Sequence, residues 1–517
     1  MNSSNPAQST PVDSGSSAAA PPELPVDLHP TFAEQFAHLA ESRGDVTALI
    51  DATGELTFAE LEARTNQVAR LFEEHGVGQG DFVLISTAVG SVTMVSAIAA
   101  WKLGAVPMPV SDRLVQAELD AITALGRPAL AVDTTDRRID GPRLTSLDDA
   151  SELSADPLPP AVAPQLKVPT SGGSTGRPKL IVSGAAAEPE TIALLGHVMG
   201  VPQNGVCLVT AAVYHNASFS DALAALTLGN TTVLMERFDP ELTLQMIEKH
   251  RAAWVYAVPT MMQRIWKLPD AVKSAYDLSS VETFFHVAAP CPQWLKRAWI
   301  DWLGPEVIYE LYGPTEGQAA TTITGTEWLE HPGSVGRATV GEVSVRDDDG
   351  RVLPPGEIGV VWLRRGTGEP PAYRYLGAES EAIDEGWETV GDVGRLDEEG
   401  YLYLTDRRSD MLLVGGVNVY PAEIEAAVDR HPEVLASCCV GLSESELGTV
   451  PALVIETADG RVPEDFDAFL SEQLSRVKRP RRVVATTRHL RDSVGKIRKR
   501  EIKSEFLEDE RNPSSRP

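Results

Sequence analysis

From residue 57 to residue 257, segments with helical periodicity alternate with short apolar runs. Residues 57–74 carry apolar side chains at helical spacing, with Thr57 as a helix N-cap and Glu60 three residues later. The other segments follow the same alternation: strands at 82–86, 105–110, 206–211, 231–235 and 254–259, and helices at 91–103 and 240–250. Such alternation is typical of parallel sheets covered by helices. We therefore predict an α/β fold with two helix-covered, mainly parallel sheets.

After residue 316 the pattern changes to antiparallel β-structure. Residues 341–364 contain two strands around a DDDG turn and then a third strand. Residues 394–408 form a hairpin with Gly400 in its turn. These strands predict a small β-barrel attached to the parallel sheets.

A third pattern begins near residue 410 and predicts a separate α+β unit. A helix spans 421–431, and strands lie at 435–441, 451–456 and 481–486. A chain of 517 residues is too long for one core. The first 25 residues are rich in Ser, Pro and Ala and lack the apolar segment of a signal peptide. We predict a disordered tail at 1–28, a large domain at 29–407 and a small, mobile domain at 408–517.

Charge and cysteine content narrow the function classes. With 45 basic and 74 acidic residues the formal charge is −29, which argues against nucleic-acid and membrane-surface binding. The longest apolar run, 92–101, is too short to span a bilayer. Four cysteines without metal-ligand spacing indicate reduced thiols, and we predict a cytoplasmic protein that is a monomer or homodimer.

The loop 170-TSGGSTGRPKL-180 has the composition of a phosphate-binding loop. It is not a Walker P-loop, because Pro178 precedes the lysine and Leu180 follows it where a hydroxyl is required. Apolar residues on both sides predict a strand–loop–strand unit, so no helix dipole is present. Backbone N–H groups, hydroxyls and Lys179 remain to bind a polyphosphate. The alternative at this point is a solvated turn without a ligand.

Four further stretches carry polar chemistry, each with an ordinary alternative. Glu316 in 309-YELYGPTEG-317 is suited to Mg²⁺ bound to a nucleotide, or is an exposed loop acid. Asp392 in 390-VGDVG-394 is suited to ribose hydroxyls, or is a turn cap. The other two are 405-TDRRSDMLLVGGVNVYPAEIE-425, at the domain boundary, and the basic 494-VGKIRKR-500.

These five stretches, in this order and spacing, resemble the adenylate-forming superfamily of acyl-CoA synthetases, adenylation domains of nonribosomal peptide synthetases and luciferase. The resemblance covers nearly all of the chain after residue 30. The runs YHNASF, HVAAPCP and VGGVNVYPAEIE look most like bacterial acyl-CoA ligases, including the bile-acid type.

The resemblance implies a two-step reaction. A carboxylic acid attacks the α-phosphorus of ATP, which gives an acyl-adenylate and pyrophosphate, and a second substrate then displaces AMP. ATP, Mg²⁺ and coenzyme A are the implied cofactors and substrates. Three acceptors fit the motifs: coenzyme A, an amino acid or other amine, or a carrier protein in trans. A non-catalytic nucleotide-binding protein is the alternative of another class.

The family's site residues transfer to matching positions. Lys496 matches the catalytic lysine; its alternative is one of twelve cations in the basic stretch 476–503. The resemblance implies that Asp392 and Arg407 bind ribose and that Tyr312 stacks on adenine. The remaining nucleotide-binding candidates are Ala288, Ala289, Pro290, Gly313 and Thr315, together with the loop residues Thr170, Ser171, Gly172, Gly173, Ser174, Thr175, Gly176 and Lys179. Glu316 and Thr175 are the metal-site candidates.

The resemblance also implies an acyl pocket, a hinge and a tunnel. His215 matches a gate between the nucleotide and acyl sites, with a core histidine as the alternative. The other pocket candidates are Tyr214, Pro259, Thr260, Met261 and Gly317. Trp254, Met261 and Trp266 either enlarge this pocket or belong to the ordinary core. The hinge position falls on Ser409, and Gly415 and Gly416 match the wall of the tunnel for the second substrate.

Overall fold

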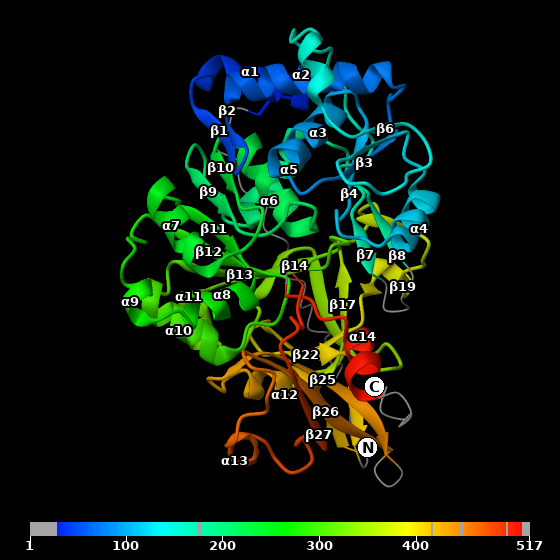
Figure 1. The fold of residues 1–517 in the computed structure, drawn as a ribbon. Helices are drawn as coiled ribbons and strands as arrows, with labels where there is room; N and C mark the ends of the chain where they lie inside the picture. Colours follow the sequence, from blue (N-terminus) through cyan, green and yellow to red (C-terminus); the bar gives the residue numbers. More distant parts are fainter. Residues whose placement is uncertain (1–27, 173–177, 415–416, 445–447, 493–494, 509–517) are drawn as a thin grey trace, which may run out of the picture.

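The computed structural model describes residues 28–172, 178–414, 417–444, 448–492 and 495–508 (Figure 1). The predicted tail, apart from its last residue Leu28, lies outside this range. No helix among the described residues is long and apolar enough to cross a membrane.

The largest sheet has nine strands, and its central strands are parallel, as the alternation predicts. Antiparallel strands close both edges. In hydrogen-bonded order the strands are β15 (Arg337–Val340), β14 (Ala320–Thr324), β13 (Ile308–Tyr312), β12 (Thr283–His286), β11 (Trp254–Ala257), β9 (Val206–Val209), β10 (Thr231–Leu234), β1 (Thr47–Asp51) and β2 (Gly54–Thr57).

A second, fully parallel sheet lies in the first part of the chain. Its order is β4 (Val106–Pro109), β3 (Phe82–Ser86), β5 (Leu130–Asp133) and β6 (Arg143–Leu144). The helices of this large region are α1 (Phe32–Arg43), α2 (Phe58–Glu74), α3 (Gly90–Lys102), α4 (Gln116–Gly126), α5 (Pro189–Val198), α6 (Asn216–Thr227), α7 (Pro240–His250), α8 (Pro259–Trp266), α9 (Asp270–Lys273), α10 (Gln293–Leu303) and α11 (Gly325–Glu330). The predicted capping box of Thr57 and Glu60 is present at the start of α2.

The antiparallel region forms two smaller sheets. One has the strands β16 (Glu342–Arg346), β17 (Gly359–Arg364), β19 (Glu381–Ala382), β20 (Glu388–Thr389), β21 (Asp392–Leu396) and β22 (Leu402–Arg407), and the other has β7 (Thr170–Gly172), β8 (Pro178–Ser183) and β18 (Tyr373–Leu376). The pairings of the first sheet run in the order β19-β20-β17-β21-β22, and β16 also pairs with β17. The predicted second strand of 341–364 is reduced to one bridge between Arg346 and Val352, because Pro354 and Pro355 provide no N–H to a ladder.

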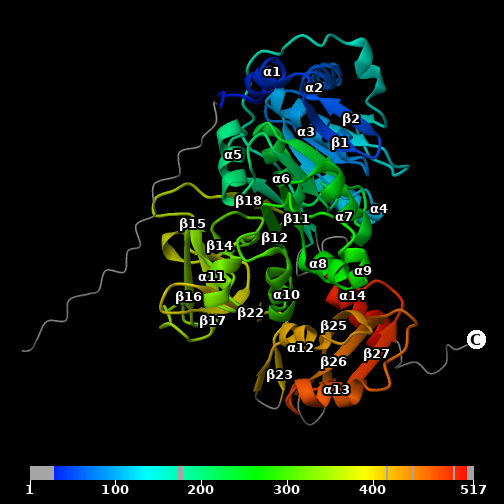
Figure 2. The ribbon, with the colours of Figure 1, turned by 90° about the vertical axis from the view of Figure 1, so that its left-hand side faces the viewer.

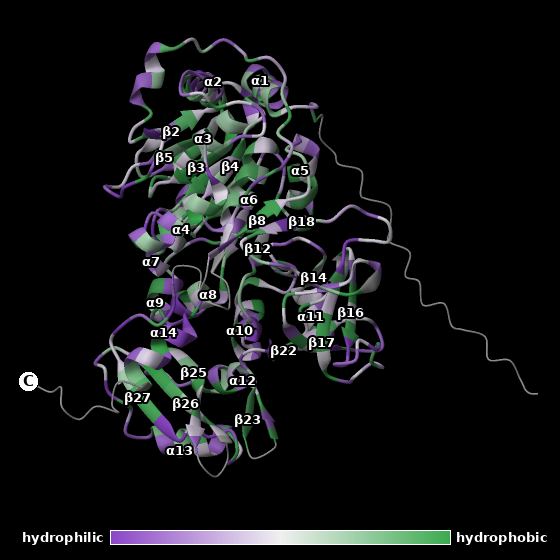
Figure 3. Ribbon diagram, turned by 90° about the vertical axis from the view of Figure 1, so that its right-hand side faces the viewer, coloured by the Kyte–Doolittle hydropathy of each residue, from purple (hydrophilic) through white to green (hydrophobic). Residues whose placement is uncertain are grey.

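The C-terminal region is the α+β unit that the sequence predicts. Its sheet contains β24 (Val417–Val419), β23 (Leu412–Val414), β26 (Gly448–Thr457), β25 (Val434–Glu444) and β27 (Arg482–Thr486), with α12 (Pro421–Val428), α13 (Phe466–Gln473) and α14 (Lys499–Lys503). Hydrophobic residues line β26 (Figure 3). Its two hydrophobic clusters begin at Leu412 and share no residue with the core of the large region. We therefore propose 29–407 and 408–517 as the two domains; they lie one above the other in Figure 2.

Candidate active site

The site forms where parallel strands of the nine-stranded sheet end. Since β9, β11, β12 and β13 run in the same direction, the segments that follow them meet at one edge. These segments contain the predicted residues Tyr214 and His215, Pro259 to Met261, Ala288 to Pro290, and Gly313 to Gly317. The fold therefore brings together four groups of candidates that are distant in sequence.

Asp392 is held at the centre of a polar cluster. The Tyr312 hydroxyl donates to Asp392 Oδ2 at 2.7 Å, and Arg407 Nε lies 3.4 Å from Asp392 Oδ1. Burial raises the pKa of Asp392, while the charge of Arg407 and the Tyr312 hydrogen bond oppose this shift. The Arg407 side chain is mostly exposed, with 63% of its surface accessible. The cluster orients one carboxylate beside an accessible guanidinium, as a polyhydroxyl ligand requires.

Glu316 is buried and has two partners from the three-stranded sheet. Lys179 Nζ lies 3.2 Å from Glu316 Oε1, and the Tyr375 hydroxyl donates to the same oxygen at 2.5 Å. The Lys179 ammonium also lies 3.9 Å from the centre of the Tyr375 ring. No group of three or more potential His, Cys, Asp or Glu metal ligands exists among the described residues. A single buried carboxylate fits Mg²⁺, which takes its other ligands from phosphates and water.

Tyr375 is the site residue that the sequence reading missed. The sequence pattern that could have indicated it is the spacing of Tyr373 and Tyr375 by two residues. In a strand such as β18 this spacing places both rings on one face. β18 pairs with β8, and Tyr375 lies directly opposite Ile181. This pairing joins segments that are almost two hundred residues apart in the sequence. Only the fold reveals that the hydroxyl reaches Glu316.

The loop 170–180 joins two antiparallel strands, as predicted. Thr170 pairs with Leu180, and Ser171 pairs with Lys179, so the lysine stands opposite the start of the loop. The predicted phosphate-binding residues Gly173, Ser174, Thr175 and Gly176 lie outside the described residues, and so does the proposed metal contact of Thr175.

The predicted nucleotide-binding segment 288–290 has an unusual backbone. Ala288 has a φ of +77°, a left-handed conformation that an alanine side chain disfavours by about 1–2 kcal/mol. The segment follows β12 directly, and Ala288 and Pro290 are exposed. A strained, accessible turn at a strand end is typical of a ligand-binding segment.

We expect Ala288→Gly to raise the apparent unfolding temperature by roughly one to two degrees, because glycine removes this strain. Ala289→Gly is the matched control: Ala289 has no positive φ, so glycine there adds only flexibility and lowers the temperature. Thermal unfolding followed by circular dichroism measures both variants. An equal fall in both would contradict strain at Ala288.

Lys496 comes from the small domain and enters this site. A tight turn presents it: Lys496 N–H donates to Asp492 Oδ1 at 2.9 Å, and Gly495 N–H donates to the Asp492 carbonyl at 3.0 Å. Lys496 is exposed to solvent. Surrounding protein atoms lower its pKa, and the charges of Asp492 and Glu316 oppose this shift. Lys496 therefore lies within electrostatic reach of Glu316 in the large domain.

Contacts between the domains fix this position. A Cβ atom added to Gly495, whose φ is +77°, would lie 2.3 Å from Thr260 Oγ1 of the large domain. Gln263 Nε2 donates to the Asp429 carbonyl at 3.2 Å, and Arg498 Nη1 lies 3.3 Å from Glu118 Oε1. The turn that carries Lys496 is thus packed against the start of α8.

His215 lies at the start of α6 and is half-buried. Burial, and then the charges of Lys496 and Arg113, lower the pKa of His215 to about 3, so the ring is neutral near pH 7. Its ring centre lies 4.3 Å from that of Tyr214. His215 is therefore within electrostatic range of Lys496, and its role as a gate stays a prediction.

The tryptophans considered for the acyl pocket belong to the core. Trp254 is fully buried, and its Nε1 donates to the Met199 carbonyl at 3.0 Å. Trp266 packs on Trp302, with ring centres 6.1 Å apart. Met261 is buried and accepts a hydrogen bond from Thr210 through its sulfur, and its place in the acyl pocket stays a prediction.

The remaining predictions concern the domain boundary and the tunnel. Ser409 is exposed directly after β22, and its hydroxyl donates to Asp410 Oδ1 at 3.1 Å; its hinge role stays a prediction. Gly415 and Gly416 lie outside the described residues. Gly317 is exposed with a φ of +74°, and Gly313 and Thr315 lie between Tyr312 and Glu316.

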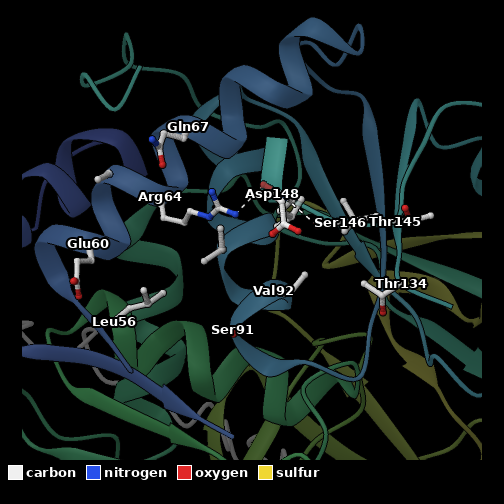
Figure 4. Close-up of a pocket in the computed structure, with 14 residues that line it drawn as sticks. Leu56, Glu60, Arg64, Gln67, Ser91, Val92, Thr134, Thr145, Ser146 and Asp148 are labelled. Atoms are coloured by element: carbon white, nitrogen blue, oxygen red, sulfur yellow. Dashed lines mark hydrogen bonds between the residues drawn. The ribbon is translucent and has the colours of Figure 1, made fainter. Parts of the chain in front are cut away.

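A cavity of about 540 Å³ lies elsewhere, between α2, α3 and the segment after β6 (Figure 4). Its lining includes Arg64, Ser91 and Asp148, and none of the predicted nucleotide or acyl residues. This cavity therefore lies apart from the predicted site residues.

Comparison with known proteins decides the family. The model of the AMP-binding enzyme family matches residues 36–368, and that of the AMP-binding enzyme C-terminal domain matches residues 423–496. The chain belongs to the AMP-binding enzyme family. The second match ends at Lys496, so the family covers both parts of the site.

Relatives of this AMP-binding enzyme include thioester- and amide-forming proteins. A feruloyl-CoA synthase of Amycolatopsis sp is 30% identical, over 87% of this chain and 94% of its own. ATP-bound MatB of Rhodopseudomonas palustris is 25% identical with a TM-score of 0.77, over 91% and 98% of the two chains. The amide bond synthetase McbA of Marinactinospora thermotolerans shares the fold at 24% identity, with a TM-score of 0.75 over 92% and 99%.

We expect Asp392→Asn to raise the KM for ATP roughly 10- to 100-fold, because the predicted ribose contacts lose their charge. The ATP dependence of acid-stimulated ATP–pyrophosphate exchange measures this. Asp397→Asn is the control, since Asp397 binds the backbone of its own hairpin turn at Glu399 and Tyr401. An unchanged KM in Asp392→Asn would refute the ribose role.

Proposed function

We propose that this AMP-binding enzyme activates a carboxylic acid with ATP and transfers the acyl group to coenzyme A. The approach of Lys496, from the small domain, to Glu316 and to the Arg407–Asp392 pair supports this most strongly. A carboxylate oxygen of the acid attacks the α-phosphorus, and pyrophosphate leaves. The thiol sulfur of coenzyme A then attacks the acyl carbon, loses its proton, and AMP leaves.

In the first step, cationic side chains of the enzyme offset the repulsion between the carboxylate and the phosphates. Two anions must approach each other, so a cation at the point of attack lowers the barrier. Lys496 is that cation, and Lys179 stands at the departing pyrophosphate. Glu316 would hold Mg²⁺, which would supply charge neutralisation at the phosphates. The neutral His215 ring separates this region from the acyl group and adds no charge there.

The second step requires Lys496 to leave. We propose that the small domain rotates near Ser409 and that Gly415 and Gly416 then line the entry for the thiol. An amine would use the same acyl-adenylate and give an amide, and McbA makes this a second candidate. The glycine pair favours the thiol, since it permits a narrow arm to pass close to the backbone.

Product analysis separates the acceptors. The enzyme is incubated with ATP, Mg²⁺, a panel of aryl, fatty and cyclic acids, and either coenzyme A or mixed amino acids, and the products are identified by mass spectrometry. We expect acyl-CoA and AMP. An amide without any thioester would reject coenzyme A as the acceptor and leave acid activation intact.

We also propose a cytoplasmic location. All four cysteines are free thiols in the structure, and Cys207, Cys438 and Cys439 are buried. Burial raises the pKa of the Cys207 thiol, so this residue is unreactive near neutral pH. Buried, reduced thiols fit a reducing compartment.

A further inference from the structure

Polar side chains follow a path along α6 from its start, next to His215, into the interior. Asn216 follows His215 and starts the helix, and its buried Oδ1 has no hydrogen-bond partner among the described residues. Ser220 lies one turn further along the same face. The ammonium of the buried Lys167 donates to the Ser220 hydroxyl. This path is polar where an apolar acyl group would need hydrocarbon.

Asp221 is the residue after Ser220 and lies on the neighbouring face of α6. It is fully buried, and neither of its carboxylate oxygens has a hydrogen-bond partner within the described chain. Burial raises the pKa of Asp221 well above its usual range, and the charge of Lys167 opposes this only partly. In turn, burial lowers the pKa of Lys167 to about 8, while Asp221 opposes that shift. The charges of Lys167 and Asp221 therefore interact, but Lys167 donates no hydrogen bond to the Asp221 carboxylate.

Tyr256 of β11 completes the cluster. The residue is fully buried, and its hydroxyl also has no partner among the described residues. Burial raises its pKa, and the charges of Asp221 and Asp492 add to this effect. Asp492 belongs to the turn that presents Lys496, so the Tyr256 hydroxyl lies within electrostatic range of both the cluster and the active site. α6 packs on β9 and β10 beside this strand (Figure 1).

Three acceptor oxygens of this cluster receive no hydrogen bond within the described chain, and the Tyr256 hydroxyl also has no partner there. Asp221 offers two of these acceptor oxygens and Asn216 offers one. Buried polar atoms in native proteins almost always have partners, so a donor from outside the chain is expected here. A carboxylate of this kind rejects an apolar group and accepts an N–H or O–H group.

We propose that the acid activated by this enzyme carries an N–H or O–H donor at the end distal to its carboxyl group, and that Asp221 binds this donor. Asn216 and Tyr256 assist along the path. This inference rests on the proposed function, because it assigns the distal part of the same acid. The substrate class is therefore a hydroxy- or amino-substituted carboxylic acid and not a simple hydrocarbon acid.

Matched acid pairs test the inference. ATP–pyrophosphate exchange is measured with benzoate against its 4-hydroxy and 4-amino derivatives, and with 3-phenylpropionate and hexanoate against their terminally substituted derivatives. We expect kcat/KM to favour the donor-bearing member of at least one pair roughly 10- to 100-fold. The double variant Lys167→Met with Asp221→Leu removes both buried charges and retains the side-chain volume. In this variant the ratio of kcat/KM for the donor-bearing acid to that for the unsubstituted acid should fall below about three.

Tyr256→Phe provides a second, conservative variant and should reduce the same ratio by removing one hydroxyl. Thermal unfolding verifies that both variants fold. A preference of the wild-type enzyme for the unsubstituted acids, or an unchanged ratio in both folded variants, would overturn the inference while acid activation stands. If no acid in the panel supports exchange, the proposed function fails, and the inference fails with it.

Discussion

Lys496→Ala is expected to reduce acid-dependent ATP–pyrophosphate exchange roughly 100- to 1000-fold. The substitution removes the cation that meets the carboxylate and the α-phosphate, and loss of one such electrostatic contact costs about this much in rate. Thioester formation from preformed acyl-adenylate should change far less, because Lys496 has left the site by then. Exchange and single-turnover thioester formation measure the two steps separately.

Arg500→Ala is the matched control for Lys496→Ala. Arg500 is an exposed cation of the same basic stretch, four residues further along, on α14. Its removal should leave exchange within about twofold. Equal losses in both variants would mean that Lys496 contributes only general positive charge.

Gly495→Ala is expected to lower exchange roughly 100-fold, because a displacement of the lysine by about 1 Å can cost this much. The added methyl group would lie 2.3 Å from Thr260 Oγ1, so the turn must move away from α8. The positive φ of Gly495 adds strain within the small domain. We expect the substitution to change the exchange rate more than the stability of either domain. The reason is that the contact joins two domains that have separate hydrophobic cores.

A glycine without this contact separates strain from displacement. Gly350 has a φ of +81°, and a Cβ atom there meets nothing within 4 Å. Gly350→Ala should therefore lower the apparent unfolding temperature slightly and leave exchange near the wild-type rate. Full exchange activity in a folded Gly495→Ala variant would show that this contact does not position Lys496.

Local sequence signals predicted much of the fold. The capping box at Thr57 fixes the start of α2, and α7 has the predicted limits Pro240–His250, since Pro favours the first helical turn. Short hydrophobic runs between turn residues predicted the positions of β3, β9 and β10. These features depend on neighbours within a few residues.

Features that depend on distant neighbours were not predictable in this way. The contact of Tyr375 with Glu316 requires the pairing of β18 with β8, which no local pattern encodes. Lys167 and Asp221 are charged residues in a buried setting, which their residue types alone do not indicate. The motif resemblance located Asp392 and Lys496, and the structure then supplied their partners Tyr312 and Asp492.

The measurement that tests this account most directly is acid-dependent exchange of labelled pyrophosphate into ATP by the wild-type enzyme. We predict exchange that requires an acid and Mg²⁺, needs no coenzyme A, and is accompanied by AMP when an acceptor is added. Absence of exchange with every acid tested, or formation of ADP and phosphate instead of AMP and pyrophosphate, would contradict it.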